Sequence, residues 1–204
     1  PSMHSSQDEQ DSRYLGTFAM VPMLEPSTQQ EAYDMMAYAF DLSEQQHIPV
    51  LMRVTTRMAH SRAVVQVAEE ARQQNALNYL SEAKDWVLLP GNARRKNDIL
   101  CGKQAEFEAE SEKSGWNRTE ARGITLGIIC SGIAYNYVSE VLASEPALAA
   151  QCYLLKISQY PLPKNSIHTL CHHCEKLLVV EDGQPFLEER LRGVLPQVQW
   201  TVCG

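Results

Sequence analysis

The chain has 204 residues, of which 44% are hydrophobic and 21% are charged, and its formal net charge is −7. This composition is typical of a globular protein that is long enough to bury a substantial core. The acidic balance argues against nucleic acid as a main partner, since affinity for nucleic acid comes from neutralising phosphates. No apolar run approaches the roughly 20 residues that cross a bilayer, and no signal-peptide pattern is present. We therefore expect a cytoplasmic protein, with its six cysteines reduced.

The first stretch, PSMHSSQDEQDSRY, is polar throughout and starts with Pro1 rather than Met. A polar run without apolar periodicity is an unusual start for a fold, so we expect the chain to be a fragment of a longer polypeptide. The side chains of residues 4–11 supply an imidazole, carboxylates, amides and hydroxyls. That composition fits the lining of a polar pocket, and it equally fits a surface turn.

Residues 26–46 are predicted to form a one-faced helix. Its apolar residues recur at helical spacing, and they are Ala32, Met35, Met36, Ala39 and Phe40. Thr28 and Glu31 have the spacing of a capping box at the start of this helix.

Beyond that helix, residues 48–54 indicate a buried strand, 55–62 a polar loop, and 63–74 a weaker helix. One helix and one strand cannot cover their own apolar faces. We therefore expect this part to belong to a sheet whose other strands lie upstream.

The middle of the chain is less regular. Residues 86–96 indicate a short extended run followed by a basic turn, and residues 103–122 are charged with little to bury. We interpret 103–122 as a surface connection that contains a domain boundary.

Strands and helices alternate in the last part. Continuous apolar runs at 123–130, 152–157, 176–181 and 198–202 predict strands. Helices are predicted between them, on an apolar face from Ile133 to Leu142, at 166–175 and at 185–193. Such alternation predicts a parallel sheet covered on both faces, which is an α/β fold.

The run Cys171-His172-His173-Cys174 has residue types that bind zinc. However, Cys171 and Cys174 fall on the same helical stripe as Ile167, and the histidines point elsewhere. A single Cys-x-x-Cys without a second pair favours packing in the core over a metal site.

Three further stretches follow predicted strands or turns. Gly132 and Gly183 each come directly after a strand, where either a tight turn or a bound ligand fits. The loop 55–62 offers Arg57, His60 and Ser61, which suit either an anion or a solvated surface. The basic run 94–96 fits a solvated surface.

Several segments resemble one family. PSMHSSQDEQDSRY, the stretch from MLEPSTQQ to MAHSR, LLPGNARRK, GIICSGIAYNYV and KLLVVEDGQPFLEE are similar to the large (alpha) subunit of indolepyruvate ferredoxin oxidoreductases. These are thiamine-diphosphate-dependent 2-oxoacid:ferredoxin oxidoreductases. The resemblance covers nearly the whole chain in order and is weakest through 98–120.

The resemblance implies a division of the chain. Residues 1–75 would be the C-terminal part of a pyrimidine-binding α/β domain, 76–120 a linker, and 121–204 a transketolase C-terminal-like parallel-sheet domain. It places His4, Ser5, Ser6 and Gln7 near the cofactor. Arg57, His60 and Ser61 would form an edge or interface loop that steers an anionic substrate.

In the complete enzyme the resemblance implies oxidative decarboxylation of an aryl 2-oxoacid to its acyl-coenzyme A. The cofactors would be thiamine diphosphate with Mg²⁺ and 4Fe-4S clusters, and the partners a beta (small) subunit and ferredoxin. The family's Gly-Asp-Gly motif for Mg²⁺ has only Glu181-Asp182-Gly183 as its nearest counterpart here, with no Asn after it. The cysteine runs that hold iron–sulfur clusters are absent, so we expect no catalysis by this chain alone.

Two other interpretations remain. The chain could be a non-catalytic α/β assembly module of a larger complex, because its predicted strand ends carry no nucleophile–base constellation. It could also be a zinc protein through residues 171–174.

Overall fold

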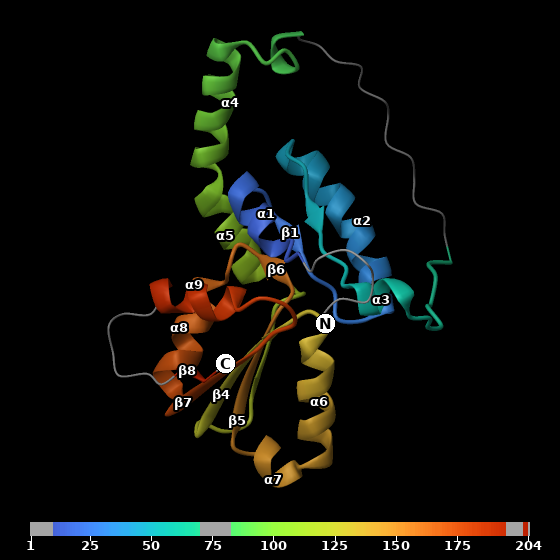
Figure 1. Cartoon of the computed structure of the whole chain (residues 1–204), viewed down its shortest axis with the longest axis vertical. Coiled ribbons are helices and arrows are strands. Elements are labelled where there is room, and N and C mark those ends of the chain that lie inside the picture. Colours follow the sequence, from blue (N-terminus) through green and yellow to red (C-terminus); the bar gives the residue numbers. More distant parts are fainter. Residues whose placement is uncertain (1–9, 70–82, 195–201, 204) are drawn as a thin grey trace.

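The computed structural model describes residues 10–69, 83–194 and 202–203. Within these ranges the chain forms an upper part with a small sheet and a lower part with a larger sheet (Figure 1). The helices of the upper part are α1 Arg13–Ala19, α2 Gln29–Gln46, α3 Thr56–His60, η1 Ala83–Asp85, α4 Pro90–Gly102 and α5 Gln104–Lys113. Those of the lower part are α6 Ala134–Ser144, α7 Pro146–Ala149, α8 Lys164–His173 and α9 Phe186–Val194.

The larger sheet has the order β3-β5-β4-β7-β8. Its strands are β3 Arg118–Ala121, β4 Leu126–Ser131, β5 Cys152–Ile157, β7 Lys176–Val180 and β8 Val202–Cys203. The pairs β5-β4, β4-β7 and β7-β8 are parallel, as the alternation of strands and helices predicts. β3 pairs antiparallel with β5, so the sheet is mixed.

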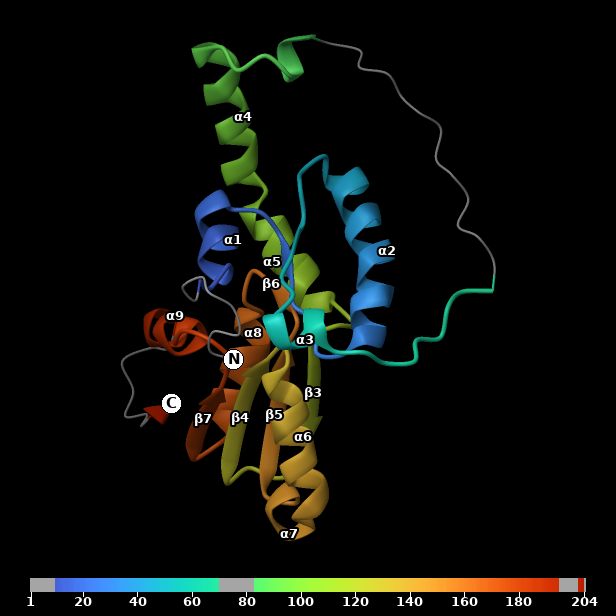
Figure 2. The same cartoon turned by 45° about the vertical axis from the view of Figure 1, so that its right-hand side comes forward.

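Two apolar layers cover this sheet, because successive residues of each strand point to opposite faces. Ile129 and Leu155 pack with α8 and α9, whereas their neighbours Ile128 and Leu154 pack with α6 and α7. The prediction of helices on both faces is therefore confirmed. Figure 2 shows α6 and α7 on one side of β4 and β5.

The small sheet has the order β2-β1-β6, from β1 Met23–Leu24, β2 Leu51–Met52 and β6 Gln159–Tyr160. β1 and β2 are parallel, and β6 pairs antiparallel with β1. β6 follows β5 of the larger sheet by one residue, so the lower part supplies a strand to the upper sheet. The sequence analysis expects the other strands of this sheet to lie upstream of the chain. It does not predict that β6 belongs to the sheet.

The helix predicted at 26–46 is confirmed as α2, and the hydroxyl of Thr28 accepts the backbone N–H of Glu31 at 3.1 Å. Its buried face is rotated from the predicted one. Met35 and Ala39 are buried, whereas Met36 and Phe40 are 46% and 63% exposed.

Four local predictions are wrong. Residues 55–62 contain the short helix α3 rather than only a loop, and residues 63–69 are not helical. The predicted basic turn at 94–96 lies inside α4. The predicted surface connection 103–122 contains α5, whose Phe107 is 1% exposed, and β3.

Candidate functional site

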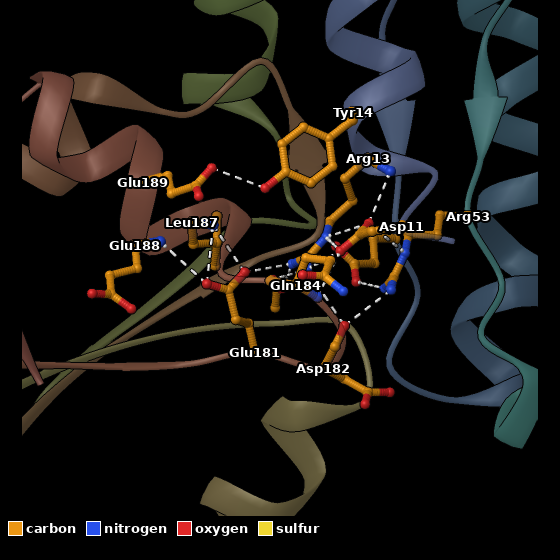
Figure 3. A network of polar contacts seen from close by, with 12 residues as sticks. Asp11, Arg13, Tyr14, Arg53, Glu181, Asp182, Gln184, Leu187, Glu188 and Glu189 are labelled. Atoms are coloured by element: carbon orange, nitrogen blue, oxygen red, sulfur yellow. Dashed lines mark hydrogen bonds and ion pairs between the residues drawn. The ribbon is translucent and has the colours of Figure 1, made fainter. Parts of the chain in front are cut away.

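A network of charged side chains fills the contact between the upper part and the carboxyl ends of β4 and β7 (Figure 3). We call this network the polar joint. Its charged members are Asp11, Arg13, Glu25, Arg53 and Glu181, and the backbone carbonyl of Asp182 also accepts from Arg53. They come from four separate segments of the sequence, which the fold brings together.

Arg13 is the centre of the polar joint, and its side chain is fully buried. Its Nε donates to Asp11 Oδ1 at 2.9 Å, and its Nη1 donates to Glu181 Oε2 at 2.8 Å. Its remaining donors reach the hydroxyl of Ser131 at 3.3 Å and the carbonyl of Gln184 at 2.9 Å. Every nitrogen of this guanidinium therefore has an acceptor, as a buried arginine requires.

Arg53 extends the polar joint toward the first sheet. Its guanidinium donates to the carboxylate of Glu25 and to the carbonyl of Asp182, the latter at 3.0 Å. The second oxygen of Glu25 accepts the hydroxyl of Tyr160 at 2.7 Å. Burial and the neighbouring Glu25 raise the pKa of Tyr160 well above its ordinary value, so this phenol stays a donor.

Two carboxylates of the polar joint occupy the glycine turns that follow β4 and β7. Gly132 has φ +50°, and a Cβ there would collide with the Glu25 carboxylate. Gly183 has φ +112°, and a Cβ there would lie 3.0 Å from Asp11 Oδ2. Such turns suit bound anions in open α/β sheets. Here the chain's own carboxylates take that position.

The two buried carboxyl groups nearest Arg13 are perturbed in opposite directions. Burial disfavours the charged form of Asp11, but its hydrogen bonds and ion pair with Arg13 outweigh this and lower its pKa. For Glu181 burial is the larger effect, and its pKa is raised. Glu181 also accepts the backbone N–H of Leu187 and Glu188 at the start of α9, at 2.8 and 3.2 Å.

A second buried ion pair joins the two parts beside the polar joint. The ammonium of Lys156, on β5, donates to the carboxylate of Glu31, on α2. Lys156 also lies 4.6 Å from the ring centroid of Tyr135. Burial lowers the pKa of Lys156 despite Glu31, which is the expected effect of desolvating an ammonium.

These contacts decide what the site can do chemically. The donors of Arg13 and Arg53 already have acceptors, so the polar joint is not an open anion cradle. Among the described residues there is no group of His, Cys, Asp and Glu that could hold a metal ion. Glu181 is engaged by Arg13 and α9, and Asp182 belongs to no such group, so Glu181-Asp182-Gly183 does not fit a Mg²⁺-diphosphate. The geometry fits a positioning role rather than catalysis.

The residues predicted near a cofactor, His4, Ser5, Ser6 and Gln7, lie outside the described residues. The second predicted group is on or next to α3. Arg57 donates to the hydroxyl of Tyr137 on α6, and its guanidinium lies 5.7 Å from that ring centroid. His60 is exposed, and the hydroxyl of Ser61 accepts from Gln29 and donates to the carbonyl of Met58. Arg57 thus lies at a contact between the two parts.

The run at 171–174 is arranged as the helical spacing predicts. Cys171 and Cys174 are each 4% exposed, and both histidines are exposed. His173 hydrogen-bonds the carbonyl of Thr169 through Nδ1 at 2.6 Å. Burial raises the pKa of the Cys171 thiol to about 11. These cysteines are core residues.

Sequence reasoning missed most of the polar joint. In the sequence Asp11 is only one member of a polar stretch, and no motif points to Arg13 or Glu25. The sequence offers one signal, because Asp11 and Arg13 lie two residues apart at the start of α1. Their distant partners could not be read from spacing.

The chain was compared with family models and with solved structures. No protein-family model matches the chain. Its fold is similar to a 2-oxoglutarate:ferredoxin oxidoreductase from Magnetococcus marinus, with a TM-score of 0.62 and 13% identity. That likeness covers 100% of this chain and 44% of the other. It supports the predicted α/β fold. Within the described residues, no helix has the length and apolar character needed to cross a membrane.

Curated relatives match almost the whole sequence. The indolepyruvate oxidoreductase subunit IorA of Methanothermobacter thermautotrophicus is 36% identical over 197 residues, which are 95% of this chain and 31% of the relative. Those of Archaeoglobus fulgidus and Pyrococcus horikoshii are 35% and 34% identical, over 95% and 94% of this chain. The chain spans 30–31% of the length of these three relatives. The family resemblance seen in the sequence is thereby confirmed, and the chain is a relative of one segment of the IorA subunits of indolepyruvate oxidoreductases.

Proposed function

We propose that this chain is a segment of the alpha subunit of an aryl 2-oxoacid (indolepyruvate):ferredoxin oxidoreductase, in which it positions the active site without carrying out the chemistry. The observation that carries this proposal is the 36% identity to an IorA subunit, collinear over 95% of the chain. In this proposal residues 1–75 end a pyrimidine-binding domain and 76–120 form a linker. Residues 121–204 are the transketolase C-terminal-like domain.

The complete enzyme would convert an aryl 2-oxoacid, coenzyme A and two oxidised ferredoxins into an aryl acyl-coenzyme A, carbon dioxide, a proton and two reduced ferredoxins. Thiamine diphosphate with Mg²⁺ would supply the carbanion chemistry, and iron–sulfur clusters would carry the electrons. Because the described residues do not fit a Mg²⁺-diphosphate, we assign its binding to other parts of the enzyme. The beta subunit and ferredoxin are the proposed partners, in the cytoplasm.

The polar joint gives this chain a specific role in that enzyme. Gln7 is four residues from Asp11, whose carboxylate is fixed by Arg13 and by the backbone N–H of Gln184 at 3.2 Å. We propose that this anchor holds the segment His4, Ser5, Ser6 and Gln7 beside the cofactor. A buried anchor close to a site limits the freedom of the residues that line it.

The site assignment is tested in the complete enzyme assembled with its beta subunit. His4→Ala and Gln7→Ala should lower kcat for indolepyruvate- and coenzyme A-dependent ferredoxin reduction, with an unchanged melting temperature. Matched controls are His172→Ala and Gln151→Ala, at exposed positions of the lower part. Kinetics equal to those of the controls would remove His4 and Gln7 from the site.

For Arg57, His60 and Ser61 we propose an edge or interface loop. The contact between Arg57 and Tyr137 supports the interface role, because it joins α3 to α6. Arg57→Gln should then weaken subunit or domain association more than it raises KM for the oxoacid. A rise in KM alone would favour substrate steering instead.

The alternative is a non-catalytic assembly module, and one observation favours it. The charged groups of the polar joint pair with one another, and among its described residues no free base lies beside a nucleophile. Activity distinguishes the two proposals. An intact, cofactor-loaded complex that reduces no ferredoxin with any 2-oxoacid would support the module.

A further inference from the structure

The arm formed by residues 83–102, which contain η1 and α4, is not covered by the described part of the chain. None of the residues of α4 is buried. Figures 1 and 2 both show α4 projecting beyond the other elements of the upper part. Contacts near its free end are local, because Asp85 pairs with Arg95 at 2.6 Å and Asn92 donates to the carbonyl of Val87 at 2.9 Å. A 13-residue helix is only marginally stable without packing, so α4 needs a partner.

One side of α4 has a short apolar stripe that contains a cation. Residues at i, i+4, i+7 and i+11 share one side of a helix, and here they are Leu89, Ala93, Lys96 and Leu100. Leu89 is 60% exposed, and the Lys96 ammonium lies 5.7 Å from the ring centroid of Trp86, which is itself exposed. The whole arm has four basic and two acidic side chains, in a chain whose net charge is −7. The uncovered stripe is thus apolar and basic.

The outer side of α2 has a similar stripe with the opposite charge. Residues at i, i+3, i+7 and i+11 are exposed there, and they are Tyr33, Met36, Phe40 and Glu44. α2 contains four acidic side chains and no basic one. Two helices with such stripes can pack side by side, with their apolar residues in contact and their charges complementary.

We propose that these stripes form an interface with a second copy of the chain, in which α4 of each copy packs on α2 of the other. The occupant is a second copy because the chain itself carries the surface that complements α4 in charge and spacing. The lengths agree, since α4 is about 20 Å long and α2 about 27 Å. A two-fold axis closes such an exchange, so each dimer contains the contact twice. The proposal does not depend on the proposed oxidoreductase function.

The first test measures the oligomeric state of the 204-residue chain by sedimentation velocity over a range of concentrations. We expect a reversible monomer–dimer equilibrium with a Kd of about micromolar size, the weak end for protein interfaces. Phe40→Glu puts a charge in the α2 stripe, so it should give monomers where the wild type is dimeric. Val141→Glu is the matched control, because Val141 is an exposed apolar residue on α6, and it should leave the dimer unchanged.

An exchange of charges tests the pairing of α4 with α2 directly. Lys96→Glu and Glu44→Lys each place like charges together in both contacts of the dimer, so each alone should weaken association about tenfold. In a heterodimer of these two variants, one contact is wild type and the other has both charges reversed. An equimolar mixture should therefore form heterodimers with nearly wild-type affinity, which native mass spectrometry detects when one variant is ¹⁵N-labelled. Lys176→Glu, at an exposed lysine of β7, is the charge control and should leave association unchanged.

Several results would overturn the proposal. A chain that stays monomeric at its highest soluble concentration lacks this interface, and a different protein would then have to cover the arm. Equal effects of a variant and its matched control would show that the stripes are not in contact. A mixture that associates as weakly as its two components would show that α4 does not meet α2. Assemblies that grow beyond two copies would show an open head-to-tail contact in place of the two-fold exchange.

Discussion

Replacing Asp11 by Asn should cost a large share of the stability of this chain. The Asp11 side chain is 1% exposed, and it is paired with both Arg13 and Arg53. Asn has nearly the same volume but no charge, and its amide nitrogen would face the arginine donors. The variant therefore leaves buried positive charge undercompensated without creating a cavity.

The size of the effect follows from the remaining partners. Removing one member of a buried ion pair costs about 3–5 kcal/mol. Arg13 keeps Glu181 at 2.8 Å and the carbonyl of Gln184 at 2.9 Å, so we expect the lower end, about 3 kcal/mol. For a chain of this size 1 kcal/mol shifts the melting temperature by about 2–4 °C, so the expected decrease is about 6–12 °C.

The assay is denaturant and thermal unfolding of both proteins between pH 7 and pH 3. The folded-state pKa of Asp11 is below its ordinary value of 3.8, so its contribution is complete well above pH 3.8. It is lost as the pH falls through the lowered pKa. The gap in stability between wild type and Asp11→Asn should therefore close in acid. Asp85→Asn is the control, because Asp85 pairs with Arg95 at 2.6 Å on the surface.

Asp85→Asn should not change stability measurably, since exposed ion pairs contribute little. The reasoning would be refuted by a loss below about 1 kcal/mol in Asp11→Asn. It would be refuted equally by a gap that stays constant down to pH 3.

Three further predictions concern turns, thiols and pH. Gly132→Ala should destabilise the chain by more than the about 1–2 kcal/mol that a left-handed conformation costs, whereas Gly91→Ala, with open space around it, should not destabilise it in the same unfolding assay. Peptide mapping after alkylation of the native chain should find Cys101 modified and Cys171 protected, because only the first is exposed; early labelling of Cys171 would contradict its burial. Glu181 has a raised folded-state pKa, so wild-type stability should fall as the pH rises from 4.5 through that value, and Glu181→Gln should remove this decline in a pH series of melting temperatures.

Strands of the larger sheet were predictable because their signal is local. β4, β5 and β7 are short runs of nearly continuous apolar residues, and burial on both faces requires such runs. The N-terminus of α2 was also local, since Thr28 and Glu31 specify it within one turn. In these places one segment of sequence contains the whole reason for its structure.

Other elements have reasons that lie elsewhere in the chain. β6 is two residues long, and it is a strand because β1 offers it a partner more than a hundred residues away. α4 has no buried residue, so apolar periodicity could not reveal it. In the local sequence Arg13 is one more charge in a polar stretch. Its burial depends on distant acceptors at Ser131 and Glu181. Long-range pairing of polar groups leaves no periodic signal.

At two strand ends of the larger sheet, the chain's own carboxylates lie against the glycine turns where many α/β sheets bind ligands. Ligands usually bind there because strand ends and helix N-termini leave unpaired N–H groups. In this chain Glu25 lies against the turn at Gly132, and Asp11 accepts an N–H just after Gly183. Both carboxylates are tethered to the same upper part, so their effective concentration at the turns is far above that of a free anion. A ligand at either turn would have to displace one of these carboxylates, and a buried arginine would then lose its partner. The strand ends therefore hold the two parts of the chain together.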